Sequence, residues 1–544
     1  MKKKIIYTMI LVFGIIVLKS AKVMAAEIPK VYFEGDISNM TTKQDEREIK
    51  LKYTSEQINF ERSTKIKIQG SSSLAYEKKN YTINLYEDDT YSDKSKVDVG
   101  YGWGAQSKYC LKANWIDKTH ARNIVSARIA GEAQRKYNVL SGLPNNGSID
   151  GFPIEVYINN EFLGLYTWNI AKDEWMWNID KNNPNHIVLG GDEYTDSVNF
   201  KTEITSFEES DWDVEVGTTN QETVDNFNKL VRFINNSTEK QFEKNFDLYL
   251  NRDACLNYIV MIYMIEGIDN TGRNMMLATY DNGQTWYPCL YDLDSTFGTN
   301  WVGDKIDYKI LQEEVFANHS DNNLIKKMVK SMADEISNRY FELRKDILSK
   351  ENLMNEFNSF IESVTETTYK KEAERWGENI PGYGIEQIEE YLDERIPYLD
   401  NLMYDRYTIK PSVTVEYSTT NLTNHDVVAT VNSNRSDIVI LKDGEVTYDY
   451  TYTFTENGTY TFEYQDWNGK NQKTITAEVN WIDKNITEDT ALEELSQKEE
   501  SESTVKIILI ITIDIIILTM IVIITKRIIQ KNKKMKYIKY FSKF

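Results

Sequence analysis

The sequence predicts a mixed α+β body, followed by a small all-β domain of immunoglobulin type and a single transmembrane helix. Three observations predict this arrangement. Polar and apolar residues alternate in the N-terminal part and over residues 410–481, helical periodicity dominates residues 321–405, and an isoleucine-rich apolar run covers residues 507–525. The 544 residues suffice for three or four average domains, and 41% hydrophobic residues allow a sizeable core.

The charge of the chain excludes one class of function. Lys and Arg number 63 against 84 Asp and Glu, which gives a formal net charge of −21. Nucleic-acid binding needs a basic face that neutralises phosphates, so we expect no nucleic-acid partner. An anionic ligand would need a local positive site or a divalent cation.

Both ends of the chain carry membrane signals. Three lysines, a short apolar run and small residues predict a signal peptide over residues 1–25, with an uncleaved anchor helix as the alternative. Residues 507–525 are long enough to span a bilayer, and the lysines of residues 526–544 predict a cytoplasmic tail that lies on anionic lipid. We therefore expect a body outside the cell membrane of a Gram-positive bacterium, joined to the span by an acidic stalk over residues 482–504.

The first half of the body is predicted to be rich in strands. Period-two alternation marks four strands, after which residues 119–137 turn helical with Thr119 as a possible N-cap. A β-hairpin follows, with its turn at residues 159–161. The predicted strands cover residues 31–33, 49–53, 65–68 and 81–85, and those of the hairpin residues 154–158 and 163–168.

The second half is predicted to be mostly helical. Helical patterns cover residues 221–266 and 321–405, and a strand pair with an Asn282-Gly283 turn lies between them. Residues 410–481 return to short strands with Asn and Gly turns, which is typical of a small β-sandwich. The three cysteines of the chain allow at most one disulfide bond, so no disulfide framework holds the body together.

Several common catalytic motifs are absent. The sequence has no phosphate loop ending in Gly-Lys-Ser/Thr, no His-Glu-x-x-His and no Cys-x-x-Cys. Its four histidines are scattered in polar contexts, which argues against a zinc site. A serine hydrolase is also disfavoured, because there is no Gly-x-Ser-x-Gly elbow.

One group of residues points to phosphoryl transfer. Asp269 and Asn274 are followed by the predicted strand pair and then by Asp292, which is the order that protein kinases use. There the first Asp meets the substrate hydroxyl, while the Asn and the second Asp hold Mg²⁺. Asp and Asn are also ordinary turn formers, so turn chemistry is the alternative interpretation.

A glycine-serine segment lies upstream of this group. Gly70, Ser71 and Ser72 lie between two predicted strands, and the next strand is preceded by Lys78 and Lys79. Such a segment could cover phosphates, and the lysines could neutralise them. Alternatively, Gly70 is a turn glycine and the lysines belong to a solvated face.

Residues 28–404 resemble the CotH kinase family, named for a bacterial spore-coat protein. The resemblance rests on dispersed motifs in the right order, among them the Asp269, Asn274 and Asp292 group with Phe297-Gly298 after it. The other motifs are residues 68–72 with 78–81, 111–117 with Arg122-Asn123, and 155–159 with 164–166. The resemblance implies an atypical protein-kinase-like, two-lobed body over residues 27–405, which binds ATP with Mg²⁺ or Mn²⁺ and phosphorylates serines of secreted or coat proteins.

The resemblance also implies roles for individual residues. Asp292 is expected to bind the metal with Asn274 as its companion, and Asp269 to act as catalytic base or further metal ligand. Lys79 is expected to contact phosphate, with Lys78 as its competitor, beside the nucleotide-binding Gly70, Ser71 and Ser72. Glu132, on the predicted helix, is the candidate ion-pair partner of that lysine.

The chain departs from the family in one place. Many relatives have Glu-Lys after the Gly-x-Tyr strand, whereas this chain has Trp168-Asn169-Ile170-Ala171-Lys172, which leaves the adenine-contacting edge open. Two functions therefore stand side by side. The chain is a membrane-anchored kinase that phosphorylates Ser or Thr of envelope, coat or secreted proteins, or it is a surface adhesin with a catalytically silent fold.

Overall fold

The computed structural model describes residues 27–70, 72–309, 322–377 and 380–486. Its contacts divide the chain into two compact units, Met1–Lys410 and Pro411–Phe544. The expected signal peptide, transmembrane segment, cytoplasmic tail and most of the stalk lie outside the described residues. Within the described ranges, no helix is both long enough and apolar enough to cross a membrane.

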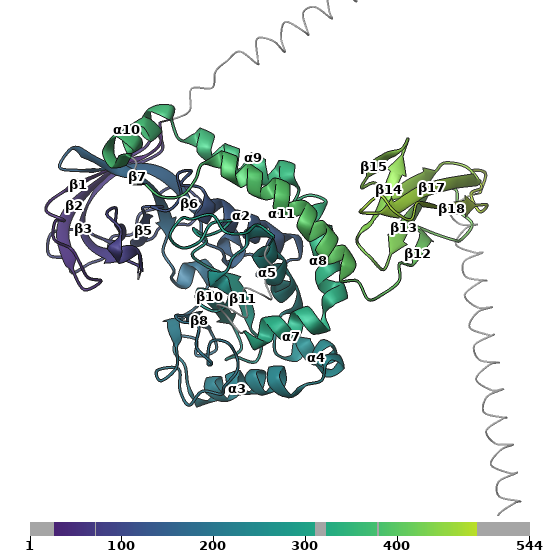
Figure 1. The fold of residues 1–544 in the computed structure, drawn as a ribbon, viewed down its shortest axis with the longest axis horizontal. Coiled ribbons are helices and arrows are strands. Elements are labelled where there is room, and N and C mark those ends of the chain that lie inside the picture. Colours follow the sequence, from purple (N-terminus) through teal and green to yellow (C-terminus); the bar gives the residue numbers. More distant parts are fainter. Residues whose placement is uncertain (1–26, 71, 310–321, 378–379, 487–544) are drawn as a thin grey trace, which may run out of the picture. The chain divides into compact units, whose positions relative to one another are not determined.

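The first unit begins with a closed seven-stranded barrel (Figure 1). Neighbouring strands are antiparallel except at the closure, where β1 pairs in parallel with β6. The strand order around the barrel is β1-β2-β3-β4-β5-β7-β6. The strands are β1 (Lys30–Glu34), β2 (Glu46–Thr54), β3 (Asn59–Gln69), β4 (Asn80–Tyr86), β5 (Lys108–Lys112), β6 (Gly151–Ile158) and β7 (Glu161–Ile170).

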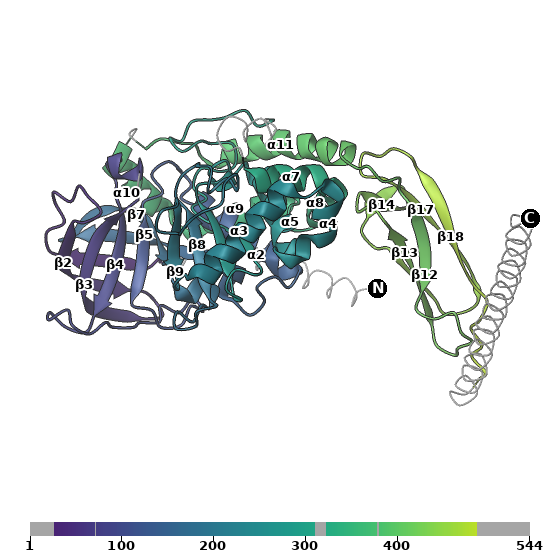
Figure 2. The same ribbon diagram turned by 90° about the horizontal axis from the view of Figure 1, so that it is seen from below.

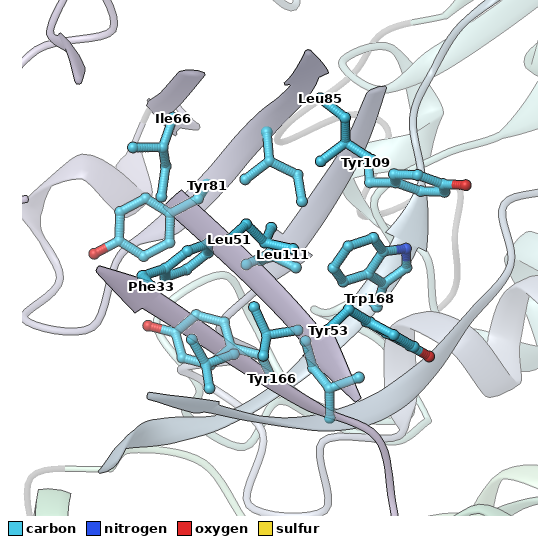
Figure 3. Packing of buried hydrophobic residues seen from close by; sticks show 14 of the residues in the cluster. Phe33, Leu51, Tyr53, Ile66, Tyr81, Leu85, Tyr109, Leu111, Tyr166 and Trp168 are labelled. Carbon is cyan, nitrogen blue, oxygen red and sulfur yellow. The ribbon is translucent and has the colours of Figure 1, made fainter. Parts of the chain in front are cut away.

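The alternation seen in the sequence builds the barrel core. Every second residue of a strand points inward, and Figure 3 shows Phe33, Leu51, Tyr81 and Trp168 packed together there. All four are at most 5% exposed. Burial of each such side chain contributes about 1.5–3 kcal/mol. The predicted strand positions in β1, β2, β3 and β4 are therefore confirmed, and each strand is longer than expected.

The predicted hairpin is confirmed as β6 and β7. Its two turn residues, Asn159 and Asn160, have φ of 48° and 69°. Two left-handed residues in a two-residue turn match the right-handed twist of the strands, and Asn tolerates this conformation better than most residues. The turn ends at Asn160, one residue earlier than expected, and Glu161 begins β7.

Helices and a small sheet form a second lobe, which comprises α2 and most of the first unit after β7, whereas α10 packs on β7 of the barrel (Figure 1). At its centre lies α5, where every residue from Ala254 to Ile265 is buried. The α-helices are α2 (Arg122–Lys136), α3 (Gln221–Asn236), α4 (Glu239–Asn245), α5 (Arg252–Ile265), α7 (Asn323–Ser331), α8 (Ala333–Arg344), α9 (Lys350–Ser363), α10 (Glu366–Trp376) and α11 (Ile385–Asp405). The short 3₁₀ turns of the unit are η1 (Ser72–Ala75), η2 (Pro144–Gly147), η3 (Glu174–Trp177), η4 (Phe246–Leu248) and η5 (Asp269–Thr271).

The sheet of the second lobe has the order β11-β10-β8-β9. Its strands are β8 (Ile187–Gly191), β9 (Trp212–Val216), β10 (Met275–Thr279) and β11 (Tyr287–Leu290). The pair β10–β11 and its turn at Asn282-Gly283, both with positive φ, confirm the prediction. By contrast, the sequence pattern does not predict β8 and β9.

The start of α2 corrects one expectation. The N-cap is Ala121, which makes no side-chain cap, and not Thr119. The Thr119 hydroxyl instead donates to Asp117 at 2.7 Å. Asp117 also forms a buried ion pair with Arg122 and accepts a hydrogen bond from the backbone N–H of Arg122 at 2.8 Å, so this carboxylate satisfies the helix start.

The second unit is a β-sandwich of two antiparallel sheets, whose strands are seen in Figure 2. Residues of both sheets, such as Val427 and Phe462, share one core. The fourth strand, β15, pairs with the third, β14, whereas in the constant-type immunoglobulin order it would pair with the fifth. The sheets are β12 (Val413–Tyr417), β13 (Val427–Ser433) and β16 (Thr451–Phe454), and β15 (Glu445–Thr447), β14 (Ile438–Lys442), β17 (Gly458–Asp466) and β18 (Lys473–Val479).

Candidate active site

A pocket of about 710 Å³ lies between the outer face of the barrel and the second lobe. This volume suits a ligand of nucleotide size. The barrel and the β3–β4 connection contribute Gly70, Ser73, Tyr76, Thr82, Cys110 and Lys112 to its lining, and the second lobe contributes Asp192, Tyr194, Asp269, Asn274, Asp292 and Asp294. The Asp269, Asn274 and Asp292 group that the sequence singled out therefore lines a single pocket.

The alternation of β4 and β5 explains why the barrel turns polar side chains toward the pocket. Tyr81 and Leu111 point into the barrel core, so their strand neighbours point outward. Thr82 and Cys110 lie opposite each other in the β4–β5 register, and both line the pocket. Lys112 continues the same outward face at the end of β5.

Lys112 and Asp292 form an ion pair in this pocket. The Lys112 Nζ atom lies 3.2 Å from Asp292 Oδ1, and Lys112 is only 8% exposed. Burial lowers the pKa of Lys112, but Asp292 and, to a smaller extent, Tyr291, Asp294 and Cys110 together outweigh it, so the pKa lies above its usual value. The lysine therefore stays charged. An ammonium has three N–H donors, and Asp292 is the only acceptor that Lys112 has among the described residues, so two donors remain for a ligand.

Asp292 and Asn274 both adopt a left-handed backbone conformation. Their φ angles are 55° and 61°. Such a conformation is strained for a residue other than Gly and persists where the surroundings hold it. The Asn274 backbone N–H donates to Gly191 at 3.0 Å, and the Asn270 side chain donates to the backbone oxygen of Tyr291 at 2.8 Å. These bonds fasten the Asn274 and Asp292 segments to each other and to β8.

Asp269 begins η5 and is held by two hydroxyl groups. Tyr194 donates to its Oδ1 atom at 2.7 Å, and Ser295 donates to Oδ2 at 3.4 Å. A carboxylate fixed in this way keeps one orientation toward the pocket, which is what a group that accepts a proton from a bound hydroxyl requires.

A third carboxylate, Asp294, adds negative charge to the same pocket. Burial and the negative charge of Asp292 raise the pKa of Asp294, and Asp269 raises it further. The positive charge of Lys112 lowers it, and the balance is a pKa of about 7. A divalent cation would relieve this crowding, and carboxylate and amide oxygens are the ligands that Mg²⁺ prefers. The donor set therefore fits a hard cation, although within the described ranges no three His, Cys, Asp or Glu side chains already converge as a metal site.

The glycine-serine segment borders the pocket as expected. Gly70 has a φ of 116°, and a Cβ atom there would lie 1.9 Å from the Ser73 hydroxyl oxygen, so this position needs glycine. Gly70 and Ser73 line the pocket. Ser71 lies outside the described residues, and Ser72 begins η1.

The structure does not bring Lys78 and Lys79 into the pocket. Lys78 is fully buried beside Glu372 of α10, with its Nζ atom 2.7 Å from the carboxylate and 3.0 Å from the Ala113 backbone oxygen. It also donates to the backbone oxygen of Leu165. Lys79 donates to the backbone oxygens of Leu74 and Tyr76 and so closes its own loop. Neither residue lines the pocket.

The expected ion pair between Glu132 and Lys79 is not formed. Glu132 lies on the face of α2 that borders a separate surface hollow, together with Asp346 and Asn352. Burial and the neighbouring Glu356 raise its pKa. The helix that follows Arg122 therefore turns Glu132 away from the pocket, which corrects the expectation.

Lys112, Tyr194 and Asp294 are pocket residues that sequence reasoning missed. The sequence around Lys112 could have indicated a functional residue. Lys112 directly follows the apolar residues Tyr109-Cys110-Leu111 of one strand, and a lysine is rarely buried without a partner of opposite charge. Nothing in the sequence around Tyr194 and Asp294 distinguishes them from ordinary loop residues.

Another part of the pocket is formed where the chain leaves the barrel. Ala171 and Lys172, directly after β7, line the pocket, and Lys172 pairs with Glu215 of β9. The Lys172 Nζ atom also lies 4.8 Å from the centre of the Tyr291 ring. The departure from the family at residues 168–172 therefore falls on the pocket wall that connects the two lobes.

Comparisons with known proteins identify the family of the chain. One solved structure that is similar is the "Crystal structure of A Helicobacter pylori proinflammatory kinase CtkA", with 12% sequence identity, 60% of this chain and 93% of that chain covered, and a TM-score of 0.20. No curated protein matches the sequence. A family model described as "CotH kinase protein" matches residues 66–408, well over half of the sequence. The chain belongs to the CotH kinase family.

Proposed function

We propose that this protein is a membrane-anchored, extracytoplasmic protein kinase that transfers the γ-phosphoryl group of ATP to Ser or Thr of envelope, coat or secreted proteins. One observation carries the proposal. The Lys112–Asp292 ion pair lies in the lining of a nucleotide-sized pocket that Asp269 and Asn274 also line. Kinase chemistry needs positive charge on the phosphates, oxygen ligands for a cation and a base near the acceptor, and these residues offer all three.

The residues of the pocket divide the chemistry among them. Lys112 donates its remaining N–H groups to phosphate oxygens and neutralises part of their charge. Asp292 and Asn274 would hold a Mg²⁺ or Mn²⁺ ion, which when bound neutralises further phosphate charge and orients the transferred group. Asp269, oriented by Tyr194, accepts the proton of the acceptor hydroxyl while the new oxygen–phosphorus bond forms and the bond to the departing ADP oxygen breaks.

The location follows from the ends of the sequence. Residues 1–25 have the composition of a signal peptide, and residues 507–525 have the length and composition of a bilayer span with lysines on its C-terminal side. This topology puts the pocket outside the membrane. Protease treatment of intact cells tests it, since the body is expected to be degraded and the C-terminal tail protected.

Radiolabel transfer tests the activity. The full-length protein is incubated with γ-labelled ATP, Mg²⁺ or Mn²⁺, and extracts of its own cell envelope. We expect labelled Ser or Thr with the wild type, and loss of labelling with Asp292→Ala and Asp269→Ala. Asp443→Asn, an exposed turn residue of the β-sandwich, serves as the matched carboxylate control.

The outcomes separate the two functions. Equal labelling by the wild type and both pocket variants would refute the assigned roles. Metal-dependent ATP binding without any transfer would favour the catalytically silent surface protein. No ATP binding with either metal would refute the nucleotide pocket itself.

A further inference from the structure

Trp301 is the most unusual surface residue of the first unit. The sequence has eleven tryptophans, all of them described, and Trp301 is the only one that is exposed, at 57%. Tryptophan is highly buried on average, because its large apolar surface favours burial. Trp301 nevertheless lines the pocket, and its ring contacts no other aromatic ring among the described residues.

The exposure of Trp301 does not come from a loose loop. Residues 298–306, which we call the Trp301 hairpin, are closed by the backbone bridge between Thr299 and Lys305 and by the Ile306 N–H donating to Gly298 at 3.1 Å. The Asn300 side chain accepts two further backbone N–H groups of the hairpin, at 3.0 and 2.9 Å. The hairpin is therefore a firm support that presents an aromatic side chain to solvent.

Two flanking contacts fix the hairpin against the rest of the unit. Lys305 pairs with Glu390 of α11 at 2.6 Å. On the other flank, the Tyr76 hydroxyl donates to the Trp301 backbone oxygen at 2.7 Å. Tyr76 belongs to the β3–β4 connection, which also carries Gly70, so the hairpin is joined to a segment that lines the same pocket.

Trp301 lines the same pocket as the carboxylates Asp269, Asp292 and Asp294. Tyr76, whose hydroxyl donates to the Trp301 backbone oxygen, lines this pocket too, and burial and then the charges of Asp294, Asp269 and Asp292 raise the pKa of Tyr76 to about 12. Ser295 contacts Asp269, and the chain reaches Trp301 six residues after it. Asp269, the proposed base for the acceptor, therefore lines the same pocket as Trp301.

We infer that the Trp301 hairpin is the docking site for the acceptor polypeptide, with Trp301 packing against a large apolar side chain next to the phosphorylated Ser or Thr. The inference rests on the proposed function, which it deepens by assigning substrate chemistry. An exposed, rigidly supported Trp beside a reactive pocket is the kind of anchor that dominates protein–protein contacts. A nucleotide base is the competing occupant, and the test separates the two.

The test measures peptide and nucleotide binding separately with the full-length protein. The probe is a positional library of dodecapeptides, each with one central Ser, added with Mg²⁺ and a non-hydrolysable ATP analogue. The variants are Trp301→Ala, Trp301→Phe and the control Leu248→Ala, an exposed apolar residue of the second lobe that does not line the pocket.

We expect the wild type to select peptides with an aliphatic or aromatic residue beside the Ser. Trp301→Ala should weaken binding of these peptides about tenfold or more and leave analogue affinity unchanged, because only the peptide anchor is lost. Trp301→Phe should keep most of the affinity and Leu248→Ala all of it. The apolar preference itself should disappear in Trp301→Ala.

Three results would overturn the inference: no apolar preference in the wild type, equal peptide binding by Trp301→Ala, or a loss confined to the ATP analogue, which would assign Trp301 to the nucleotide base. Failure of the proposed function looks different. In that case the wild type transfers no phosphate from ATP to its best-bound peptides, while Trp301→Ala still loses their binding.

Discussion

Two buried lysines among the described residues of the first unit pair with carboxylates in very different surroundings. Lys78 pairs with Glu372 between the barrel and α10, and its ammonium has three protein acceptors. Lys112 pairs with Asp292 across the pocket, with one acceptor among the described residues. A lysine whose three donors are all satisfied by protein has nothing left for a ligand, whereas Lys112 has two donors to offer.

The comparison distinguishes a lysine that only stabilises the fold from one that can bind a ligand. Burial and an opposite charge are common to both pairs and therefore do not distinguish them. The two lysines differ in the number of N–H donors that no protein atom of the described residues accepts and in whether they line a pocket.

The variant Lys112→Met should abolish most of the phosphate transfer. Loss of one preorganised donor to developing or transferred charge lowers kcat by about 10²- to 10³-fold. Stability should change little, because the Asp292 side chain is about a third exposed and can be solvated. Steady-state kinetics and urea unfolding check the two parts, with the exposed Lys96→Met as control. Unchanged kcat in Lys112→Met would remove this lysine from the chemistry.

The variant Lys78→Met should instead affect folding. It leaves the Glu372 carboxylate buried without its partner, which is expected to lower the free energy of unfolding by about 3–5 kcal/mol. The double variant Lys78→Met/Glu372→Met should recover much of that loss, since no unpaired charge remains. Urea unfolding measures both. Transfer activity per folded molecule should stay near that of the wild type, and a selective loss of activity would contradict the comparison.

The buried pair of Glu266 with Arg395 should make stability depend on pH. Their side chains lie 3.3 Å apart, but burial raises the pKa of Glu266 from 4.5 to about 7, with Arg395 opposing and Asp307 adding to the rise. The folded state therefore binds more protons than the unfolded state between these values, and stability falls as pH rises from about 4.5 to about 7. The loss is about 3 kcal/mol at most.

Urea unfolding at several pH values checks this slope. The variant Glu266→Gln should flatten it, because the amide does not titrate. An equally steep fall with Glu266→Gln would assign the pH dependence to other groups.

The smallest effect is expected for Lys79→Met. This side chain holds the backbone oxygens of Leu74 and Tyr76, and Tyr76 lines the pocket. Loss of such a hydrogen bond lowers the stability of the structure that it holds by about 0.5–1.5 kcal/mol. The KM for ATP should therefore rise about three- to tenfold, while kcat stays unchanged. A fall in kcat as large as that of Lys112→Met would restore Lys79 to the role first expected of it.

Much of the local structure was predictable because it depends on neighbouring residues. Alternation located β1, β2, β3 and β4, and two asparagines or an Asn-Gly pair located two hairpin turns. Short apolar strands such as β8, Ile187–Gly191, do not alternate and were missed. The barrel closure was also missed, because the pairing of β1 with β6 joins segments far apart in the sequence.

The residues of the candidate site could likewise be predicted where they are close in sequence and not where they come from distant segments. Asp269, Asn274 and Asp292 are close in sequence and are separated only by a hairpin, so their order predicted their grouping. Lys112 comes from a distant strand, and only the packing of the barrel on the second lobe shows that it meets Asp292. The choice of Lys79 and Glu132 failed because sequence order does not fix which way a side chain points.

Because β1 pairs in parallel with β6, the barrel can close only after β6 has been synthesised. Lys30 has Glu155 as its neighbour in the register, so the first strand emerges long before its second partner exists. Until then the outer hydrogen-bonding groups of β1 are unpaired and can pair with another chain. A chain truncated before β6 would therefore keep an open, aggregation-prone sheet edge and would not form a smaller barrel.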